Sequence, residues 1–217
     1  MDRGPLVKSL SKINIHDVFS RFSKITPEPK GELKYTSAYT LLVAVVLSAQ
    51  STDIGVNKAT RKLFSLAATP EKMFQLGENK IIENIRTIGL YKNKAKNIVN
   101  LSQKLIENFK SKVPKTHKEL QSLPGVGRKT ANVVLSMAFG IPTIAVDTHV
   151  FRVSNRTGIA TGKNVDEVEK KLIKRLPKKF FFHAHHWLIL HGRYTCKARN
   201  PLCAECIISD LCPSKSH

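Results

Sequence analysis

The sequence predicts an all-α fold of about ten short helices, because three kinds of local signal point the same way. Apolar residues recur at helical spacing, as at Ile98, Leu101 and Leu105. Helix start signals stand before such stretches, as in Thr69–Glu71, where a threonine cap precedes proline and glutamate. Finally, the sequence contains no apolar–polar alternation flanked by hairpin turns, which argues against strands.

Further helices are predicted by caps and apolar faces. Thr116 and Glu119 have the spacing of a capping box. Leu41–Leu47 is apolar throughout but too short to span a bilayer, which suits a buried core helix. Two other helices have apolar residues at spacings of three and four: Ala131, Val134, Leu135 and Ala138 in one, and Val165, Val168 and Leu172 in the other. The first of these is expected to end at Gly140, shortly before Pro142.

The charge balance is the unusual feature of the composition. Thirty-six Lys and Arg residues against 16 Asp and Glu give a formal net charge of +20, whereas the hydrophobic share of 41% is ordinary. So much positive charge on a compact chain indicates a polyanionic partner such as nucleic acid. A proteome with a general basic bias is the alternative. With no membrane span and no signal segment in the sequence, a cytoplasmic protein associated with the nucleoid is expected.

All four cysteines lie in one short C-terminal segment, at Cys196, Cys203, Cys206 and Cys212. Such clustering is typical of a metal centre, and a disulfide framework is the weaker interpretation in a reducing compartment. Structural zinc sites usually use two close cysteine pairs, whereas only one close pair is present here. The spacing therefore favours a [4Fe–4S] cluster over zinc without excluding zinc.

A glycine-rich turn in Leu123–Gly127 joins two predicted helices. Gly125 and Gly127 permit a tight turn with exposed backbone N–H groups around Val126, and the next helix begins near Arg128. Backbone N–H groups beside a helix N-terminus form an anion site, for which a DNA phosphate is a natural ligand. Glycine-rich turns between helices are also common as plain structure.

Three segments together carry a specific resemblance. Leu-Pro-Gly-Val-Gly-Arg-Lys-Thr-Ala-Asn-Val-Val at 123–134 resembles the helix–hairpin–helix of the endonuclease III family of iron–sulfur DNA glycosylases. Ala145–Arg152 is similar to the segment of that family that carries its catalytic aspartate, and His186–Cys196 is similar to its entry to the cluster. The matches lie in order from about Leu41 to Cys212.

The resemblance implies that Lys129 is the nucleophile and that Asp147 is its carboxylate partner. An uncharged lysine amine attacks C1′ of a damaged nucleotide, expels the base and forms a Schiff base that permits β-elimination 3′ to the abasic site. The carboxylate can accept a proton or stabilise the charged sugar. Asp147 also stands where a helix N-cap is expected, which is its alternative role.

Further positions are assigned to DNA by the same resemblance. Gln50 and Leu90 match the residues that fill the gap left by an extruded nucleotide. Lys197 and Arg199 lie in the first cluster loop, where cations pinned on a short loop can bind phosphates. Asp53 is expected either to cap the next helix or to line the pocket.

The cysteine spacing also matches the family, which implies that all four cysteines bind a [4Fe–4S] cluster with a structural role. A separate metal site is the less favoured interpretation of the C-terminal histidines His183, His185, His186 and His191. Asn200 and Leu202 replace residues that are often basic in the family, which suggests a weaker hold on phosphate.

The family fold implies two helical domains with a DNA groove between them. One comprises residues 31–141 with the helix–hairpin–helix, and the other comprises residues 1–30 and 142–217 with the cluster. The implied substrate is double-stranded DNA with damaged pyrimidines or abasic sites, bound by a monomer. The first ten residues have no assigned role.

Two rival functions differ in the residues that they require. A mismatch adenine glycosylase of the same superfamily has a glutamate shortly before the glutamine region, where this sequence has Val45 and Val46, and lacks the lysine nucleophile. A catalytically silent helix–hairpin–helix protein would not need both Lys129 and Asp147. Both residues are present, so a bifunctional glycosylase and AP lyase is the expected function.

Overall fold

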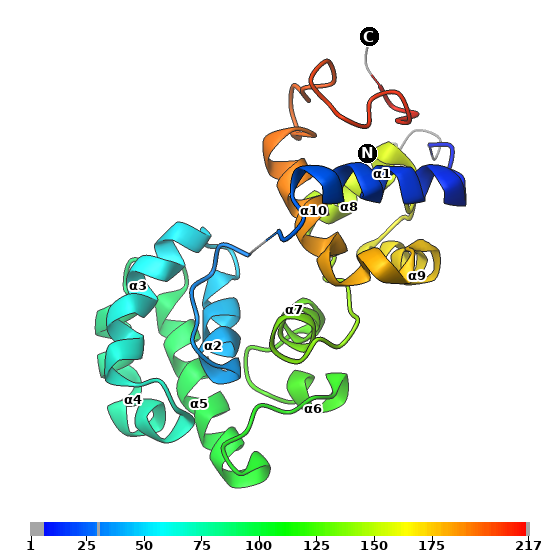
Figure 1. The fold of residues 1–217 in the computed structure, drawn as a ribbon. Coiled ribbons are helices and arrows are strands. Elements are labelled where there is room, and N and C mark those ends of the chain that lie inside the picture. The colour runs from blue at the N-terminus through cyan, green and yellow to red at the C-terminus, as the bar shows by residue number, and fades with distance from the viewer. Residues whose placement is uncertain (1–6, 30, 216–217) are drawn as a thin grey trace. The chain divides into compact units, whose positions relative to one another are not determined.

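A computed structural model describes residues 7–29 and 31–215, and the regular structure within these ranges is entirely helical (Figure 1). Ten α-helices and one short 3₁₀ helix follow one another along this part of the chain. The predicted all-α class is therefore confirmed. No helix in the described ranges combines the length and the apolar composition needed to cross a membrane.

The chain divides into two compact units. Unit 2 is the continuous segment Glu32–Ile141, and unit 1 combines the described residues up to Gly31 with those from Pro142 onward. Residues 1–6 and 30, which belong to the expected cluster domain, lie outside the described residues. Each unit has its own hydrophobic core.

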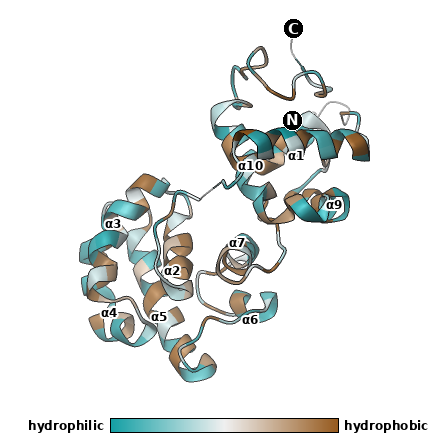
Figure 2. Cartoon of the chain, viewed as in Figure 1, coloured by the Kyte–Doolittle hydropathy of each residue, from teal (hydrophilic) through white to brown (hydrophobic). Residues whose placement is uncertain are grey.

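Unit 2 contains six helices, of which one is apolar and is surrounded by the other five. They are α2 (Ala38–Ser48), α3 (Asp53–Leu66), α4 (Pro70–Ile85), α5 (Tyr91–Phe109), α6 (His117–Gln121) and α7 (Arg128–Phe139). Every residue from Tyr39 to Leu47 is buried, so α2 is apolar on all sides and forms the centre of the unit (Figure 2). The predicted core helix at Leu41–Leu47 is confirmed.

Helices α2 and α5 run antiparallel within this core. The Tyr39 hydroxyl, near the start of α2, is hydrogen-bonded to the Ser102 hydroxyl in the second half of α5 at 2.6 Å. At the other end, the Lys94 ammonium, one turn into α5, binds backbone carbonyls at the end of α2. The predicted apolar face of α5 is buried, at Ile98, Leu101 and Leu105. The end of α2 therefore lies beside the start of α5.

Unit 1 is formed by helices from both ends of the chain: α1 (Lys12–Ile25), α8 (Thr148–Thr157), α9 (Val165–Arg175), η1 (Lys178–Phe180) and α10 (Phe181–Tyr194). The Phe19, Phe180 and Trp187 rings pack together in its core. The Trp187 indole N–H donates to the Thr26 carbonyl at 2.7 Å, which fixes α10 to the end of α1. After α10 the chain continues without further helix to Lys215.

The predicted helix ends are largely confirmed. Thr69 accepts a hydrogen bond from the N–H of Lys72 at the start of α4, with Pro70 in the first turn. Thr116 caps α6 by accepting from the Glu119 N–H, and its own hydroxyl donates to the Glu119 carboxylate. Gly140 ends α7 with φ +64°, a left-handed conformation that glycine adopts without strain.

Two details differ from the predictions. Val165, expected on the buried face of α9, is 48% exposed because it is the first residue of the helix, and the core contacts begin at Val168. Helix α4 is interrupted at Gly77, whose φ of +76° and ψ of 164° are not helical. A single glycine in an otherwise periodic stretch gives no sequence signal that separates a kink from a tolerated helical position.

Candidate functional site

The hairpin of unit 2 is anchored by two apolar side chains. Leu123 and Val126 are 2% and 6% exposed and belong to the core of the unit, and the Val126 N–H donates to the Leu123 carbonyl at 3.1 Å. Because the Val126 side chain packs inward, its expected contact with DNA has to use its backbone. Gly125 and Gly127, on either side of it, are exposed.

Each hairpin glycine meets a different requirement. Gly125 has φ +76°, and a Cβ at this position would lie 3.0 to 3.2 Å from three atoms of the Asn97 side chain on α5. Gly127 has φ −88° with no protein atom within 4 Å of a Cβ, and it precedes α7 without a side chain that caps the helix. The start of α7 thus keeps backbone N–H groups and the positive end of the helix dipole for an anion.

Lys129, the expected nucleophile, is exposed in the first turn of α7, next to the exposed Arg128. The sequence order Gly127–Arg128–Lys129 therefore places the amine within a few residues of the candidate phosphate site. An exposed amine can reach a ligand bound at this turn.

Gln50 and Leu90, expected to fill the gap in DNA, lie on two neighbouring loops of unit 2. Leu90 is 62% exposed, and Gln50 is also exposed. Both have left-handed backbone conformations, with φ +59° and +55° respectively. A Cβ built on Gly89 would lie 3.8 Å from the Gln50 carbonyl oxygen, so the two loops adjoin.

The residues between α2 and α3 also show two features that the sequence did not reveal. Thr52, and not Asp53, is the N-cap of α3, because the Thr52 hydroxyl accepts from the Gly55 N–H at 3.2 Å. The cap role considered for Asp53 is therefore wrong, and Asp53 is the first residue of the helix. The second feature is buried Lys94, whose ammonium binds residues on both sides of Gln50.

In unit 1, Asp147 is the N-cap of α8. Its Oδ1 accepts a hydrogen bond from the Val150 N–H at 2.8 Å, and its Oδ2 lies 3.3 Å from Nδ1 of His149. The cap role proposed from the sequence is confirmed. Capping uses one carboxylate oxygen, so it is compatible with a chemical role for the other.

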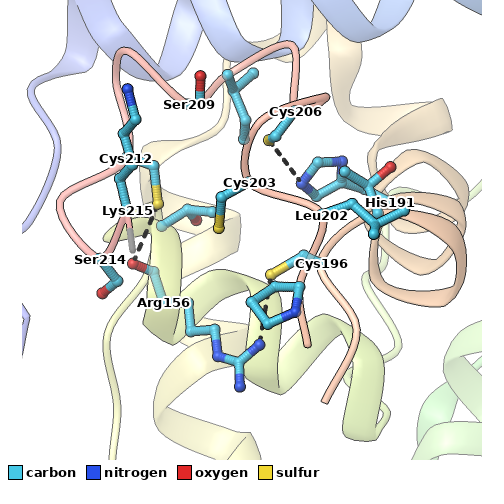
Figure 3. A pocket seen from close by; sticks show the side chains of 14 residues that line it. Arg156, His191, Cys196, Leu202, Cys203, Cys206, Ser209, Cys212, Ser214 and Lys215 are labelled. Carbon is cyan, nitrogen blue, oxygen red and sulfur yellow. Dashed lines mark hydrogen bonds between the residues drawn. The ribbon is translucent and has the colours of Figure 1, made fainter. Parts of the chain in front are cut away.

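The four cysteines lie around one cavity of about 310 Å³ in unit 1 (Figure 3). The segment that carries them closes through backbone hydrogen bonds, among them Cys206 N–H to the Cys203 carbonyl and Cys212 N–H to the Ser209 carbonyl. No disulfide joins them, and all four are partly buried. The clustering predicted from the sequence is thus present in three dimensions.

Four thiols around one cavity are suited to hold a metal centre once they are ionised. In the described part of the chain, no set of three or more His, Cys, Asp or Glu side chains is arranged to hold a single metal ion. Burial raises the pKa of the Cys206 and Cys212 thiols, so thiolates at these positions need compensating positive charge. A [4Fe–4S] cluster held by Cys196, Cys203, Cys206 and Cys212 would supply that charge.

The loop that carries Lys197 and Arg199 is hydrogen-bonded to Arg156 of α8. The Arg156 guanidinium donates to the Lys197 carbonyl at 2.6 Å and to the Ala198 carbonyl at 2.9 Å. Its Nη1 also lies 3.9 Å from the Cys196 sulfur. Lys197 and Arg199 are both exposed. Sequence reasoning missed Arg156, because nothing in its spacing distinguishes it from other basic residues of α8.

The four C-terminal histidines all lie on α10, with the His185 and His186 rings 5.3 Å apart, but they have different partners. His191 is buried with Nε2 3.8 Å from the Cys206 sulfur, and it lines the cluster cavity. His185 Nδ1 lies 2.8 Å from the Ala145 carbonyl oxygen, and the His183 ring packs against Trp187. Burial lowers the pKa of His186. Among the described residues these four form no separate metal site.

Two family models match the chain. The model described as "HhH-GPD superfamily base excision DNA repair protein" matches residues 43–178, which is more than half of the sequence. The model described as "Iron-sulfur binding domain of endonuclease III" matches residues 196–212, the segment that begins and ends with a cysteine of the cavity.

Similar proteins cover nearly the whole chain. Endonuclease III of Escherichia coli (strain K12) is 53% identical over 206 residues, which span 95% of this chain and 98% of the relative. Endonuclease III of Rickettsia felis (strain ATCC VR-1525 / URRWXCal2) is 56% identical over 198 residues, spanning 91% and 93%. A solved structure of a trapped endonuclease III–DNA covalent intermediate, an estranged-adenine complex, has a TM-score of 0.88 at 46% identity and covers 95% of this chain and 97% of its own.

Fold, cluster segment and near full-length similarity agree with one another. The expected glycosylase and AP lyase activity and the expected [4Fe–4S] cofactor are confirmed by them. The protein is a DNA-binding enzyme of base excision repair, and the chain belongs to the endonuclease III family.

Proposed function

We propose that the protein removes oxidised pyrimidines from duplex DNA and cleaves the resulting abasic sites through a Schiff base on Lys129. The observation that carries this proposal is the position of Lys129, exposed in the first turn of a helix whose N-terminus is left open by Gly127. A nucleophile and a phosphate site on the same turn let one phosphate contact orient the sugar for attack.

In the first step the uncharged Lys129 amine attacks C1′ of the damaged nucleotide. The C1′–N bond to the base breaks, and the base leaves with the electron pair and takes up a proton, while the attached amine loses one. The C1′–O4′ bond then breaks and O4′ takes up a proton, so that the ring-opened sugar remains as a protonated Schiff base on the lysine. Loss of a proton from C2′ then expels the 3′ phosphate. The covalent endonuclease III–DNA intermediate in the solved relative supports this course.

Asp147 is proposed as the carboxylate that assists this step. It accepts a proton from the attacking amine or stabilises positive charge on the sugar as the base departs. Its support is that the Val150 N–H fixes Oδ1 and thereby orients the carboxylate.

Phosphate contacts are proposed for two basic or N–H-rich loops. In unit 2 they involve the Gly125, Val126 and Gly127 backbone together with Arg128. In unit 1 they involve the Lys197 and Arg199 side chains. The first site is supported by its exposed glycines. The second is supported by the hydrogen bonds from Arg156 to the loop carbonyls, since a pre-ordered loop loses less entropy on binding.

Gln50 and Leu90 are proposed to occupy the space that an extruded nucleotide leaves in the stack. An exposed leucine can wedge between base pairs, and a glutamine amide can hydrogen-bond the base left without its partner. Their adjacent loops, exposed side chains and left-handed backbone conformations support the assignment.

Cys196, Cys203, Cys206 and Cys212 are proposed as the ligands of the [4Fe–4S] cluster. The cluster supplies a rigid cross-link for a segment that has no helix of its own, and the residues of that segment present cations to DNA. We also propose that residues 31–141 form one functional domain, that residues 1–30 and 142–217 form the other, and that the protein acts as a monomer associated with the nucleoid.

Borohydride trapping tests the nucleophile. Wild-type protein is incubated with an abasic duplex and with duplexes that each carry one oxidised pyrimidine, and Lys129→Gln is compared with Lys118→Gln, which replaces an exposed lysine of α6. We expect Lys129→Gln to lose adduct formation and base release by at least about 10³-fold while it still binds DNA. Lys118→Gln should retain both.

Each part of the proposal has its own contradicting result. Adducts formed by Lys129→Gln at the wild-type rate would exclude Lys129 as nucleophile. Base release by the wild type without any adduct would require a water-activating mechanism instead. Release of undamaged adenine opposite a mismatch, with no release of oxidised pyrimidines, would contradict the substrate assignment.

A further inference from the structure

Lys94 is a buried lysine at the point where the two gap-filling loops meet. Its side chain lies in the core of unit 2 and is only 5% exposed. Its ammonium donates to the Leu47 carbonyl at 2.9 Å, the Ala49 carbonyl at 2.6 Å and the Ser51 hydroxyl at 3.0 Å. Lysine is rarely buried without partners of this kind, because the charged form is costly to remove from water.

Two of these acceptors flank Gln50. Ala49 precedes it and Ser51 follows it, so the ammonium fixes the chain on both sides of a residue with φ +55°. A left-handed conformation of a residue other than glycine persists only where the surroundings hold it. The remaining acceptor, Leu47, offers one of the last carbonyls of α2, where the helix dipole is negative and favours a cation.

The backbone of the same residue holds the other loop. The Lys94 N–H donates to the Leu90 carbonyl at 3.0 Å, which is the first hydrogen bond of α5 and fixes Leu90 at the helix start. Leu90 also has a left-handed conformation, with φ +59°. One residue is therefore bonded to Leu90 through its backbone and to both neighbours of Gln50 through its side chain.

The same side of α5 also contacts the hairpin. Asn97, three residues after Lys94, packs against Gly125, and the Lys104 ammonium, seven residues after Asn97, donates to the Ser122 carbonyl just before the turn at 2.8 Å. These spacings of three and seven place the residues on one helical face. Helix α5 therefore connects both loops and the hairpin within one unit.

We propose that Lys94 is a positioning residue that holds Gln50 and Leu90 in register, so that both enter the duplex together when the damaged nucleotide is extruded. This inference depends on the gap-filling roles proposed above for those two residues. Lys94 itself is buried and does not contact DNA in this scheme.

If Lys94 only filled space in the core, an apolar side chain of the same length would replace it without loss. Burial also lowers the pKa of Lys94, because its charged form is removed from water, so the ammonium is costly at this place. An apolar side chain would not provide the two hydrogen bonds to Ala49 and Ser51 in the loop or the one to Leu47 at the end of α2. Lys94→Met is therefore the informative variant, since it keeps the volume and removes the bonds.

The experiment compares two substrates under single-turnover conditions. One duplex carries a thymine glycol, whose base has to be extruded into the enzyme, and the other carries a preformed abasic site, which has no base to extrude. A 2-aminopurine next to the lesion reports base unstacking by fluorescence. Lys96→Met, which replaces an exposed lysine on the same helix, is the control. Lys94→Gln keeps a side-chain N–H donor group, and it is used in place of Lys94→Met if that variant does not fold.

We expect Lys94→Met to slow thymine glycol release by roughly tenfold or more, while abasic-site cleavage stays within about threefold, because a misplaced contact group mainly affects extrusion. The fluorescence increase should be slower to the same extent. Lys94→Gln should show an intermediate rate, and Lys96→Met should be unchanged. An equal loss on both substrates, or no loss on either, would overturn the inference.

Gln50→Ala and Leu90→Ala separate this inference from the proposed function. If both slow thymine glycol release and Lys94→Met does not, the positioning role alone is wrong. If neither has an effect, the gap-filling assignment fails, and the positioning role fails with it.

Discussion

At the scale of single residues, the two hairpin glycines are required for different physical reasons. Gly125 adopts φ +76° and lies against the Asn97 side chain, so its requirement belongs to the free protein. Gly127 has an ordinary φ of −88° and open space around it. If Gly127 is needed, the reason is the approach of a ligand to its backbone.

This contrast gives the first prediction. Gly125→Ala should lower the free energy of unfolding by about 1–2 kcal/mol, because alanine is strained at this φ and its Cβ displaces Asn97. Gly127→Ala should leave stability within about 0.5 kcal/mol but weaken DNA binding, because the methyl group faces the proposed phosphate. Urea denaturation and a DNA titration at fixed salt measure the two effects. A stability loss for Gly127→Ala equal to that for Gly125→Ala would contradict this distinction.

Functional residues could be recognised from the sequence only where they lie in a continuous motif. Lys129 and the cysteines lie in continuous motifs, and the family resemblance that these motifs carry suggested their roles. Lys94 and Arg156 bind carbonyls 45 and 41 residues away in sequence, at Ala49 and Lys197. Among 36 Lys and Arg residues, no local pattern identifies such long-range donors.

At the scale of helices, Asp147 combines a proposed chemical role with a structural one. Its Oδ1 caps α8 through the Val150 N–H, whereas the chemistry needs a carboxylate that can carry charge or accept a proton. An amide oxygen can cap a helix as well as a carboxylate oxygen, but it cannot accept the proton. The two roles are therefore separable by substitution.

The second prediction uses this difference. Asp147→Asn should keep the stability of the wild type within about 0.5 kcal/mol, and Asp147→Ala should lose about 1 kcal/mol because the cap is removed. Both variants should lose base release by about 10²-fold or more. Thermal unfolding and single-turnover assays measure the two quantities. Retained activity in Asp147→Asn would show that capping is the only role of the carboxylate.

Helix existence was predictable because caps and apolar periodicity are local. The starts of α4 and α6 and the end of α7 follow from Thr69, Thr116 and Gly140. The kink at Gly77 was not predictable because a single glycine is also tolerated within a helix, and the exposure of Val165 was not predictable because apolar spacing does not fix the first residue of α9. Similarly, Thr52 and Asp53 are adjacent and both residue types can cap a helix. The sequence therefore does not fix which of them is the N-cap of α3.

At the scale of the whole molecule, the proposed functional residues are distributed over two units with separate cores. The proposed nucleophile and gap-filling residues belong to unit 2, and the carboxylate and the cluster segment belong to unit 1. The sequence indicated the all-α class and the metal centre, but composition alone marked no boundary, because unit 1 is assembled from both chain ends. The net charge of +20 favours association of the folded protein with DNA, whose phosphates are negatively charged.

The separate cores predict that loss of the cluster has a local effect. Cys196, Cys206 and Leu211 pack against the core of unit 1, and none of them belongs to the core of unit 2. The cysteine segment is also tied to α1, because the Arg21 guanidinium donates to the Ile207 carbonyl and binds the Asp210 carboxylate.

The third prediction is therefore that Cys203→Ser, by removing one proposed ligand, increases amide hydrogen exchange in residues 196–215 and in the part of α1 around Arg21. Peptides from α2 and α5 should keep their protection, because their backbone hydrogen bonds depend on the core of unit 2. Hydrogen–deuterium exchange with mass spectrometry measures this, with Ser214→Ala in the same segment as control. Equal loss of protection in α2 would mean that the cluster stabilises the whole molecule, so that the two cores do not unfold independently.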